Sequence, residues 1–312
     1  MQRIGFVIFP NFHVQSLALT SAFEVANLDL GEDGYEIHLL SERGGPVRST
    51  AGFSVTTEAF GEATFDTVII GAGLEPELAT PKLLEFARRS SETSRRLAAP
   101  CVGAFILAEA GVLDGRRATT HWAYARELQS RFPGVKVEED RIFIVDGSIW
   151  TSAGMTAGTD LALAMIEKDH GRDVSRTVAR KMVLFHRRAG GQSQFSSLLE
   201  LDAKSDRIQR ALEYASRNLR NTLSVDELAE AARLSPRQFS RAFRAETGQT
   251  PAKAVETLRV EEARLMMEQG RSSMDEIAIE TGFDDRERMR RAFLRTLGQP
   301  PQTVRRNSRA AD

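Results

Sequence analysis

One cysteine stands at the kind of turn where catalytic nucleophiles are found. Cys101 follows the apolar run Ala98–Pro100, and the small residues after it open a helix. Such a strand-turn-helix elbow is related in its logic to the G-x-S-x-G turn of hydrolases. The backbone dipole at the start of the helix would favour the thiolate. The alternative interpretation is that Cys101 is simply a small buried apolar side chain.

Other groups are expected to approach this cysteine. Gly71 and Gly73 follow the apolar strand Phe65–Ile70, and their N–H groups could face the thiol as an oxyanion hole does. In a doubly wound sheet, both turns lie at the carboxyl ends of strands, where ligands bind. His121 lies 20 residues after Cys101, without an identifiable acidic partner. It is either the base of a cysteine catalyst or, in the alternative interpretation, a pocket-lining or hydrogen-bonded structural histidine.

Elements that could position these residues alternate along the first 171 residues. Strand-like and helix-like runs follow one another at Ile4–Phe9, Leu17–Leu28, Tyr35–Leu40, Phe65–Ile70, Lys82–Arg96 and Leu161–Asp169. Asp146-Gly147 lies between two β-rich runs and is a hairpin signal. The alternation predicts an α/β fold, a doubly wound and mostly parallel sheet covered on both faces. Residues 174–188 look helical.

After Ser205 the pattern is entirely helical and contains a repeat. Residues 241–251, RAFRAETGQTP, return at 291–301 as RAFLRTLGQPP, with an offset of 50. Upstream, 228–229 match 277–278 at an offset of 49, so one extra residue enters the second turn. A repeated helix, turn and helix predicts an all-α domain with two helix-turn-helix units.

The second helix of each unit has a distinct outward face. Phe239 and Phe243 mark the buried face of the first, and Met289 and Phe293 that of the second. The outward residues that we expect to contact DNA are Arg237, Gln238, Ser240, Arg241, Arg288, Arg290 and Arg291. Arginine reads guanine and glutamine reads adenine in the major groove, while other contacts reach phosphates. The alternative is the solvated face of an ordinary helical bundle.

Local signals support the helix limits. Ser235 and Gln238 fit a capping box, and the run Asp284-Asp285-Arg286-Glu287 offers a similar acidic cap to the second helix. Gly282 marks a tight turn where the first unit has Arg233.

Charge and composition narrow the class of protein. The chain is 41% hydrophobic and 27% charged, as in ordinary globular proteins. Residues 204–312 carry 21 basic and 17 acidic side chains, a net charge of +4, whereas residues 1–203 carry −5. This asymmetry suggests an anionic partner for the second part. No apolar run reaches the roughly 18 residues of a membrane span, and one cysteine excludes a disulfide scaffold. We expect a cytoplasmic protein without membrane contact.

The second part resembles the DNA-binding domain of the AraC/XylS family over residues 206–306. The motif residues are Ile277-Ala278, Gly282-Phe283, Arg291-Ala292-Phe293 and Gly298-Gln299-Pro300-Pro301. The resemblance implies that a long helix, fitted by 252–268, joins the two units. One monomer would then place two recognition helices in successive major grooves, about 10 base pairs apart.

The first part, over residues 1–190, is similar to the ThiJ/PfpI domain, a class I glutamine-amidotransferase-like and flavodoxin-like fold. The matching runs are Cys101–Trp122, Thr151–Gly154, Thr156–Gly158 with Asp160, and Gly190–Gln194. As a whole the chain resembles the GlxA-type regulators, which fuse these two domains. The resemblance implies a ligand-sensing domain at 1–190, a linker at 191–205, a DNA-binding domain at 206–306 and a tail at 307–312.

The resemblance also implies that the catalytic machinery is incomplete. Enzymatic relatives commonly have a histidine after the cysteine, where this chain has Val102, and an acid where it has Ser16. Cysteine catalysis needs a base and a group that orients it. We therefore expect no catalytic residue, metal or cofactor. The predicted ligand pocket consists of Gly71, Gly73, Cys101, Val102, His121 and Ser152.

Three functions remain open. The first is a transcription regulator with a double-stranded DNA operator and a small-molecule effector, which the resemblance suggests is nitrogen-containing. We expect such a regulator to form a homodimer through its first domain, and RNA polymerase is a further candidate partner. The second is a cysteine-dependent hydrolase, amidotransferase or hydratase with an attached DNA-binding module. The third is a redox sensor, in which the lone Cys101 would need an intersubunit disulfide or a stable sulfenate.

Overall fold

The computed structural model describes residues 1–184, 188, 190, 194, 205–268 and 272–309, with residues 268 and 306–309 described by their backbone alone. The chain divides into two compact units, Met1–Gln194 and Phe195–Asp312, which are described separately. Most of the linker expected at 191–205 lies outside the described residues. No helix in the described ranges combines the length and apolarity needed to cross a membrane.

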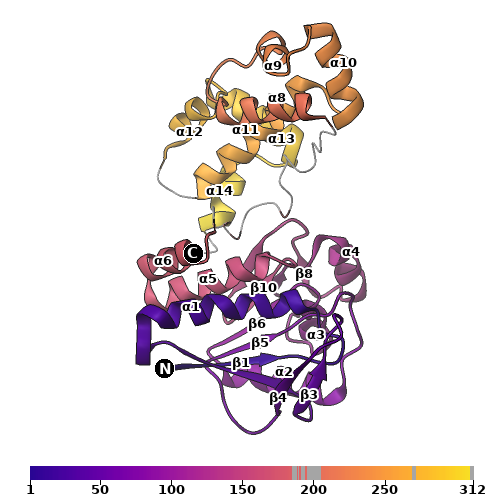
Figure 1. Cartoon of the computed structure of the whole chain (residues 1–312), viewed down its shortest axis with the longest axis vertical. Helices are drawn as coiled ribbons and strands as arrows, with labels where there is room; N and C mark the ends of the chain where they lie inside the picture. Colours follow the sequence, from indigo (N-terminus) through magenta and orange to yellow (C-terminus); the bar gives the residue numbers. More distant parts are fainter. Residues whose placement is uncertain (185–187, 189, 191–193, 195–204, 269–271, 310–312) are drawn as a thin grey trace. The chain divides into compact units, whose positions relative to one another are not determined.

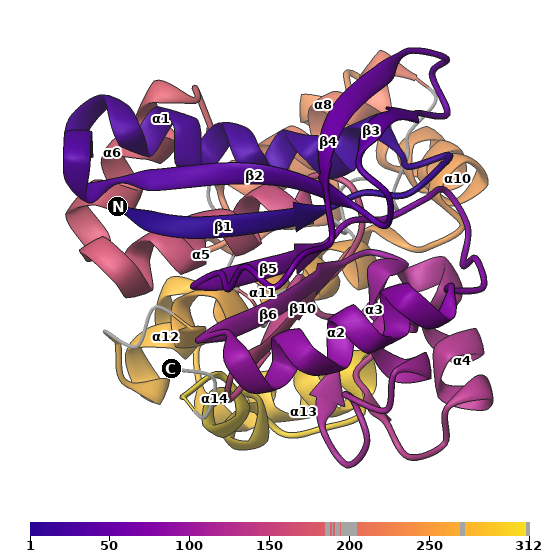
Figure 2. The same cartoon turned by 90° about the horizontal axis from the view of Figure 1, so that it is seen from below.

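The first unit is built on an eight-stranded sheet. Its strands are β1 (Gln2–Val7), β2 (Tyr35–Ser41), β3 (Gly45–Arg48), β4 (Ser54–Ala59), β5 (Thr67–Ile70), β6 (Arg96–Pro100), β9 (Phe143–Asp146) and β10 (Ile149–Ser152). The order is β3-β4-β2-β1-β5-β6-β10-β9, and only the outer strands β3 and β9 are antiparallel to their neighbours. Figure 2 shows β2, β1, β5 and β6 side by side in this order. A small parallel pair is formed by β7 (Arg117–Ala118) and β8 (Lys136–Val137).

Helices cover both faces of the sheet (Figure 1). One layer contains α1 (Thr20–Leu30), α5 (Ala157–His170) and α6 (Arg172–Lys181); the other contains α2 (Pro81–Thr93) and α3 (Gly103–Glu109), with α4 (Trp122–Arg131) beside β8. Short 3-10 turns at Val14–Leu19 and Gly31–Asp33 flank α1. Side chains alternate along the central strand, because Phe6 packs in the α1 layer and Val7 in the α2 layer. The predicted doubly wound sheet is confirmed.

Some element limits differ from the prediction. The hairpin at Asp146-Gly147 is confirmed, with β9 and β10 paired antiparallel and Gly147 at a φ of 63°. The helix expected to reach Arg96 was wrong at its end, because α2 stops at Thr93 and Arg96 opens the buried strand β6. The helix expected over 174–188 ends at Lys181. The hairpin of β3 and β4 was not predicted, since its strands are short and largely exposed.

A buried ion pair explains why Arg96 belongs to a strand. Its Nη2 donates to the Asp169 carboxylate at 2.6 and 2.8 Å, and both side chains are at most 3% exposed. Tyr35 donates its hydroxyl to the same carboxylate at 3.1 Å, and burial raises the pKa of that phenol. The Trp150 ring lies 5.2 Å from the guanidinium carbon. The cluster ties the end of α5 to β2 and β6.

The second unit is helical throughout its described residues. Its helices are α8 (Asp206–Arg217), α9 (Val225–Ala231), α10 (Pro236–Thr247), α11 (Pro251–Glu268), α12 (Met274–Glu280), α13 (Arg286–Leu297) and α14 (Pro301–Arg309). Two apolar cores form, one around Phe239 and Phe243 and the other around Met289 and Phe293. The long helix α11 contributes to both, as expected for a helix that joins two units.

The repeat is visible in the caps and turns. Capping boxes open α9 at Ser224 and α12 at Ser273, and left-handed glycines end α10 and α13. The turn in the first helix-turn-helix unit has four residues, 232–235, and the turn in the second helix-turn-helix unit has five, 281–285. This confirms the inserted residue.

The two turns differ in one constraint. Arg233 and Gly282 hold the same left-handed conformation, at φ values of 55° and 74°. A Cβ on Gly282 would lie 2.1 Å from the Leu219 carbonyl oxygen, so a side chain cannot fit there. The first turn leaves room for the arginine that stands in it.

Candidate ligand pocket and DNA-binding face

Cys101 occupies the predicted elbow between β6 and α3. Its backbone adopts a φ of 54°, which is unusual for a residue other than glycine. The Cys101 N–H donates to the Ser152 carbonyl at 2.9 Å, and the Thr120 hydroxyl donates to the Cys101 carbonyl at 2.7 Å. These bonds fix the turn and leave the residue only 8% exposed.

The thiol is not activated in the way that its position at a helix start suggested. Burial raises the pKa of Cys101 above its ordinary value, although backbone hydrogen bonds from Val102 and Met155 act in the opposite direction. The expectation of a favoured thiolate was therefore wrong. The helix that follows has only seven residues, so its dipole is small and desolvation dominates.

His121 lies next to the thiol but is oriented by the backbone of α4. Its Nδ1 accepts from the Ala123 N–H at 3.3 Å, which makes it the N-cap of that helix. A Cβ placed on Gly154 would lie 2.2 Å from His121 Cδ2 and 3.0 Å from Cys101 Sγ, so both groups pack against this glycine. Burial lowers the pKa of His121. The neutral ring with Nδ1 accepting carries its proton on Nε2, next to Cδ2, which makes that nitrogen a donor.

Only part of the predicted pocket surrounds one cavity. Cys101 and Gly73 line a cavity of about 10 Å³, together with His13, Ser16 and Met155. This volume corresponds to about one water molecule. Within the described residues no carboxylate lines it. Ser16, where enzymatic relatives have an acid, donates its hydroxyl to the His13 carbonyl at 2.8 Å.

The other predicted pocket residues have different surroundings. The Gly71 N–H donates to the Val7 carbonyl at 2.8 Å, so it extends the sheet and cannot serve an oxyanion. Ser152 is fully buried and donates to the Ala153 carbonyl at 3.1 Å. Val102 lines a different cavity. The prediction grouped these residues because strand ends lie close together, but backbone carbonyls already accept from the Gly71 N–H and the Ser152 hydroxyl.

That second cavity, of about 630 Å³, was missed from the sequence. It lies at the carboxyl ends of β1 and β2, where doubly wound sheets bind ligands. Apolar side chains such as Phe9, Phe60 and Ile106 line it beside charged ones. The charged lining residues are Glu42, Arg43, Arg48, Glu75 and Glu77. No sequence signal could have found this site, because one wall is the unpredicted hairpin of β3 and β4.

The first recognition helix, α10, presents the expected residues. Arg237 and Arg241 are exposed, and no ion pair to either occurs among the described residues. Ser240 is half-buried beside them. The predicted capping box is present, and in it Gln238 Oε1 accepts from the Ser235 N–H and hydroxyl. The Gln238 side chain is therefore partly committed to the helix start.

The second recognition helix, α13, repeats this geometry with different electrostatics. Asp285 caps it, accepting from the Arg288 N–H at 2.7 Å. Arg288 also pairs with Asp284 at 2.7 Å. Glu287 accepts from Arg290 at 2.7 and 2.8 Å and lies 3.4 Å from Arg291. The arginines of α13 are thus paired with acids, unlike Arg237 and Arg241 of α10.

A groove rich in arginine lies between the two helix-turn-helix units of the second domain. Its cavity volume is about 590 Å³, and its walls come from α11, α13 and the turn after α8. The arginines that line it are Arg220, Arg259, Arg288, Arg291 and Arg295. Arg220 and Arg259 were missed, because their approach depends on how the two units pack.

Comparison with known proteins agrees with this architecture. Residues 2–168 match the DJ-1/PfpI family and residues 228–307 match a helix-turn-helix domain family. The HTH-type transcriptional regulator GlxA of Rhizobium meliloti is 33% identical over 315 residues, which cover 99% of this chain and 97% of that relative. The isonitrile hydratase of Pseudomonas putida is 34% identical over 181 residues, covering 56% of this chain and 75% of the enzyme.

A solved structure shows the same fold. The crystal structure of an AraC family transcriptional regulator from Pseudomonas putida superposes with a TM-score of 0.54 at 22% identity, covering 58% of this chain and all of that one. The near-complete match to GlxA includes both domains, whereas the match to the hydratase leaves almost half of this chain uncovered. The chain therefore belongs to the DJ-1/PfpI family through its first domain and, as a whole, to the HTH-type transcriptional regulators that join this domain to an AraC-type helix-turn-helix domain.

Proposed function

We propose that residues 206–306 bind operator DNA through α10 and α13 and that residues 1–190 control this binding by sensing a small, nitrogen-containing metabolite. The observation that carries the proposal is the repeated unit, whose two recognition helices both present arginines, with Arg241 and Arg291 at equivalent positions. Such helices read base edges in the major groove, and a pair of them covers successive turns of DNA.

The proposed DNA contacts are of two kinds: those of the recognition helices and those of the arginine-rich groove with the DNA backbone. Arg237, Gln238, Ser240 and Arg241 of α10 and Arg288, Arg290 and Arg291 of α13 are the proposed contact residues. The arginine-rich groove between the units supports a path for the DNA backbone, since phosphates favour clustered guanidinium groups.

The effector site is proposed near Cys101, Gly73 and His121, with Val102 linking it to the larger cavity. The larger cavity has the size of ordinary small-molecule sites, which measure about 300–1,000 Å³. Its combination of apolar walls with carboxylates and arginines suits a small metabolite that carries charged groups. We further propose that the protein acts as a homodimer through its first domain.

We propose no catalytic activity for the first domain. The raised pKa of Cys101, the donor orientation of His121 Nε2 and the absence of a carboxylate from the described lining of the thiol cavity support this. Isonitrile hydration or amide hydrolysis remains the alternative, because the elbow is intact and the hydratase is a relative. Turnover of an isonitrile or an amide that is lost in Cys101→Ala would favour the enzyme.

A titration of the full-length protein against DNA from its own promoter region tests the regulator. A random duplex of equal length serves as the control, and each titration is repeated at several salt concentrations. We expect specific binding that protects two successive major-groove faces and weakens steeply with salt. Equal affinity for the two duplexes at every salt concentration, with or without cell metabolites, would overturn the proposal.

A further inference from the structure

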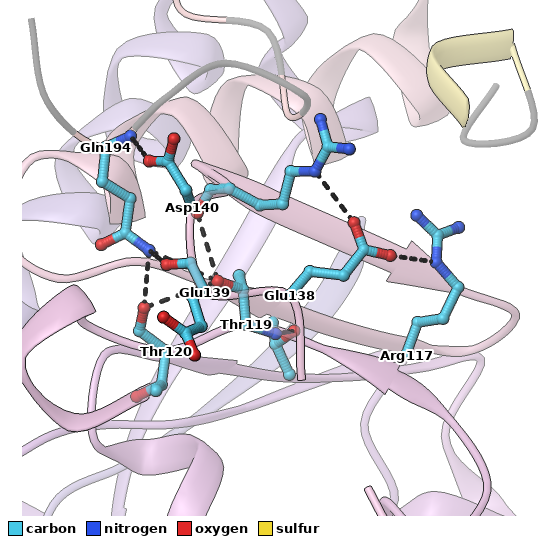
Figure 3. A network of polar contacts seen from close by, with 9 residues as sticks. Arg117, Thr119, Thr120, Glu138, Glu139, Asp140 and Gln194 are labelled. Atoms are coloured by element: carbon cyan, nitrogen blue, oxygen red, sulfur yellow. Dashed lines mark hydrogen bonds and ion pairs between the residues drawn. The ribbon is translucent and has the colours of Figure 1, made fainter. Parts of the chain in front are cut away.

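The last residue of the first unit is held by its side-chain amide. Gln194 Nε2 donates to the Thr120 carbonyl at 2.8 Å and to the Glu139 carbonyl at 3.0 Å (Figure 3). Its Oε1 accepts from the Trp122 N–H at 2.9 Å. The Gln194 backbone N–H donates to the Asp140 carboxylate at 2.7 Å. Both donors and the acceptor of this amide are therefore used on the backbone of the first unit.

The segment that holds Gln194 also forms one side of the thiol site. The buried Thr120 donates its hydroxyl to the Cys101 carbonyl at 2.7 Å. His121 lies between Thr120 and Trp122, the two residues whose backbone binds Gln194. Any displacement of the His121 ring that moves the His121 backbone therefore directly disturbs the hydrogen bonds of the Gln194 amide.

A second contact holds the other side of the thiol site. Arg188 donates from its N–H and Nε to the buried Asp160 at 2.8 and 2.9 Å, and from Nη2 to Thr156 at 2.7 Å. Thr156 lies two residues after Gly154, the glycine against which the thiol and the His121 ring pack. The hydrogen bonds of Arg188 and Gln194 thus hold the two segments that flank Cys101.

We propose that Gln194 is a positioning residue that couples occupation of the space beside Cys101 to the DNA affinity of the second unit. The cavity there has a volume of about 10 Å³, so an occupant larger than water displaces neighbouring groups, and the His121 ring is a neighbour of the thiol because it packs with Cys101 Sγ against Gly154. Displacement of His121, the residue before Trp122, breaks the hydrogen bond from the Trp122 N–H to Gln194. The two states, Gln194 bound and Gln194 released, supply the differential affinity that coupling requires. The inference rests on the proposed function.

The chain contains one cysteine, so iodoacetamide can serve as a probe of defined position. Displacement of iodide by the thiolate attaches a carbamidomethyl group to Sγ, which the cavity cannot hold without moving its wall. Operator affinity of the full-length protein is measured before and after complete alkylation, which intact mass verifies. We expect a change of about 5- to 150-fold, the usual range of coupling between sites. Cys101→Ala treated in the same way controls for reaction elsewhere.

Two matched pairs of variants isolate Gln194. Gln194→Ala is compared with Gln129→Ala, because Gln129 also clamps backbone, donating to the Val135 carbonyl at 2.9 Å and accepting from the Val137 N–H at 3.2 Å. We expect alkylation to leave operator affinity unchanged in the first variant and to change it as in the wild type in the second.

The second pair of variants tests a single hydrogen-bond donor, the Trp122 N–H. Trp122→Pro deletes the N–H that Gln194 accepts, at the first position of α4, where proline is well tolerated. His121 already has the extended conformation that a following proline requires, with φ −58° and ψ 132°. Trp122→Ala loses the same ring but keeps the N–H. We expect Trp122→Pro to lose the response to alkylation and Trp122→Ala to keep it, which a purely structural role of Gln194 would not produce.

The outcomes separate the inference from the proposed function. Equal responses in wild type, Gln194→Ala and Trp122→Pro would overturn the inference, as would complete alkylation without any change in wild-type operator affinity. Both results leave the proposed function intact if the unmodified protein still prefers the operator over a random duplex. Loss of that preference in the unmodified wild type would refute the proposed function instead. Thermal unfolding of each variant verifies that the protein remains folded.

Discussion

Replacement of Arg241 by alanine tests the orientation of the first recognition helix. Arg241 is exposed on α10, one turn from Arg237, and no described acid pairs with it. It can therefore engage DNA without first breaking an ion pair. Arg291 holds the equivalent position of α13, but Glu287 lies 3.4 Å away. The two substitutions remove the same side chain from the same place in a repeated unit.

The expected magnitude depends on what Arg241 contacts. A bidentate contact to a base contributes about 1–3 kcal/mol, so its loss weakens operator binding about 5- to 150-fold and leaves random DNA nearly unaffected. A phosphate contact instead weakens binding to both duplexes and lowers the slope of log K against log salt by about 0.9. We expect base reading for Arg241 and a smaller loss for Arg291→Ala, because Glu287 already competes for that guanidinium.

Fluorescence anisotropy with labelled operator and random duplexes, at four salt concentrations, distinguishes these cases. Arg176→Ala is the matched control, because it removes an exposed arginine from α6 in the first unit. Wild-type operator affinity in both Arg241→Ala and Arg291→Ala would refute the assigned face of the recognition helices. A loss equal to that of Arg176→Ala would mean that only net charge matters.

Further predictions concern stability and the thiol. Gly282→Ala should lower the free energy of unfolding in urea by at least about 2 kcal/mol, from left-handed strain and the clash with a carbonyl oxygen, whereas Arg233→Gly should change it by less than about 1 kcal/mol. Equal effects of the two would contradict the difference in room. Asp169→Ala should cost about 3–5 kcal/mol, because Arg96 stays buried without its partner, and thermal unfolding that matches wild type would contradict the ion pair. Because burial raises the pKa of Cys101, its alkylation rate should keep rising with pH beyond about 8.5, the ordinary value, and a plateau below that pH would contradict this. Cys101→Ala should leave operator affinity unchanged, and a loss would place the thiol in the DNA-binding structure.

The helical repeat was the part of the fold most accessible from the sequence. The apolar residues of α10 and α13 recur at helical spacing, and serine, proline and glycine mark the ends of these helices. These signals are local, so they can be recognised without knowledge of the tertiary structure. The end of α2 was misplaced because Arg96 looks like a surface residue until Asp169 is known to lie beside it.

The ligand site was predicted less well, for a physical reason. The elbow at Cys101 follows from its local sequence, but the size of the cavity beside it depends on residues from other segments of the chain, such as His13, Ser16 and Met155. The availability of the Gly71 N–H likewise depends on its strand partner Val7. Desolvation of the thiol is a sum over all these neighbours, so the helix start alone gave the wrong direction of the pKa shift.

The two recognition helices share a scaffold but differ in how their arginines are held, and this difference bears on specificity. Any phosphate attracts an unpaired arginine, so Arg237, which we do not assign to a base, favours DNA of every sequence. Arginines that pair with Glu287 leave it only where DNA groups replace the carboxylate with comparable geometry, which penalises poorly matched sites. We therefore expect the unpaired Arg237 to contribute mainly to affinity for any DNA, and the paired arginines of α13 to contribute mainly to discrimination. Glu287→Gln should tighten binding to random DNA more than binding to the operator, and an equal gain on both duplexes would contradict this division of roles.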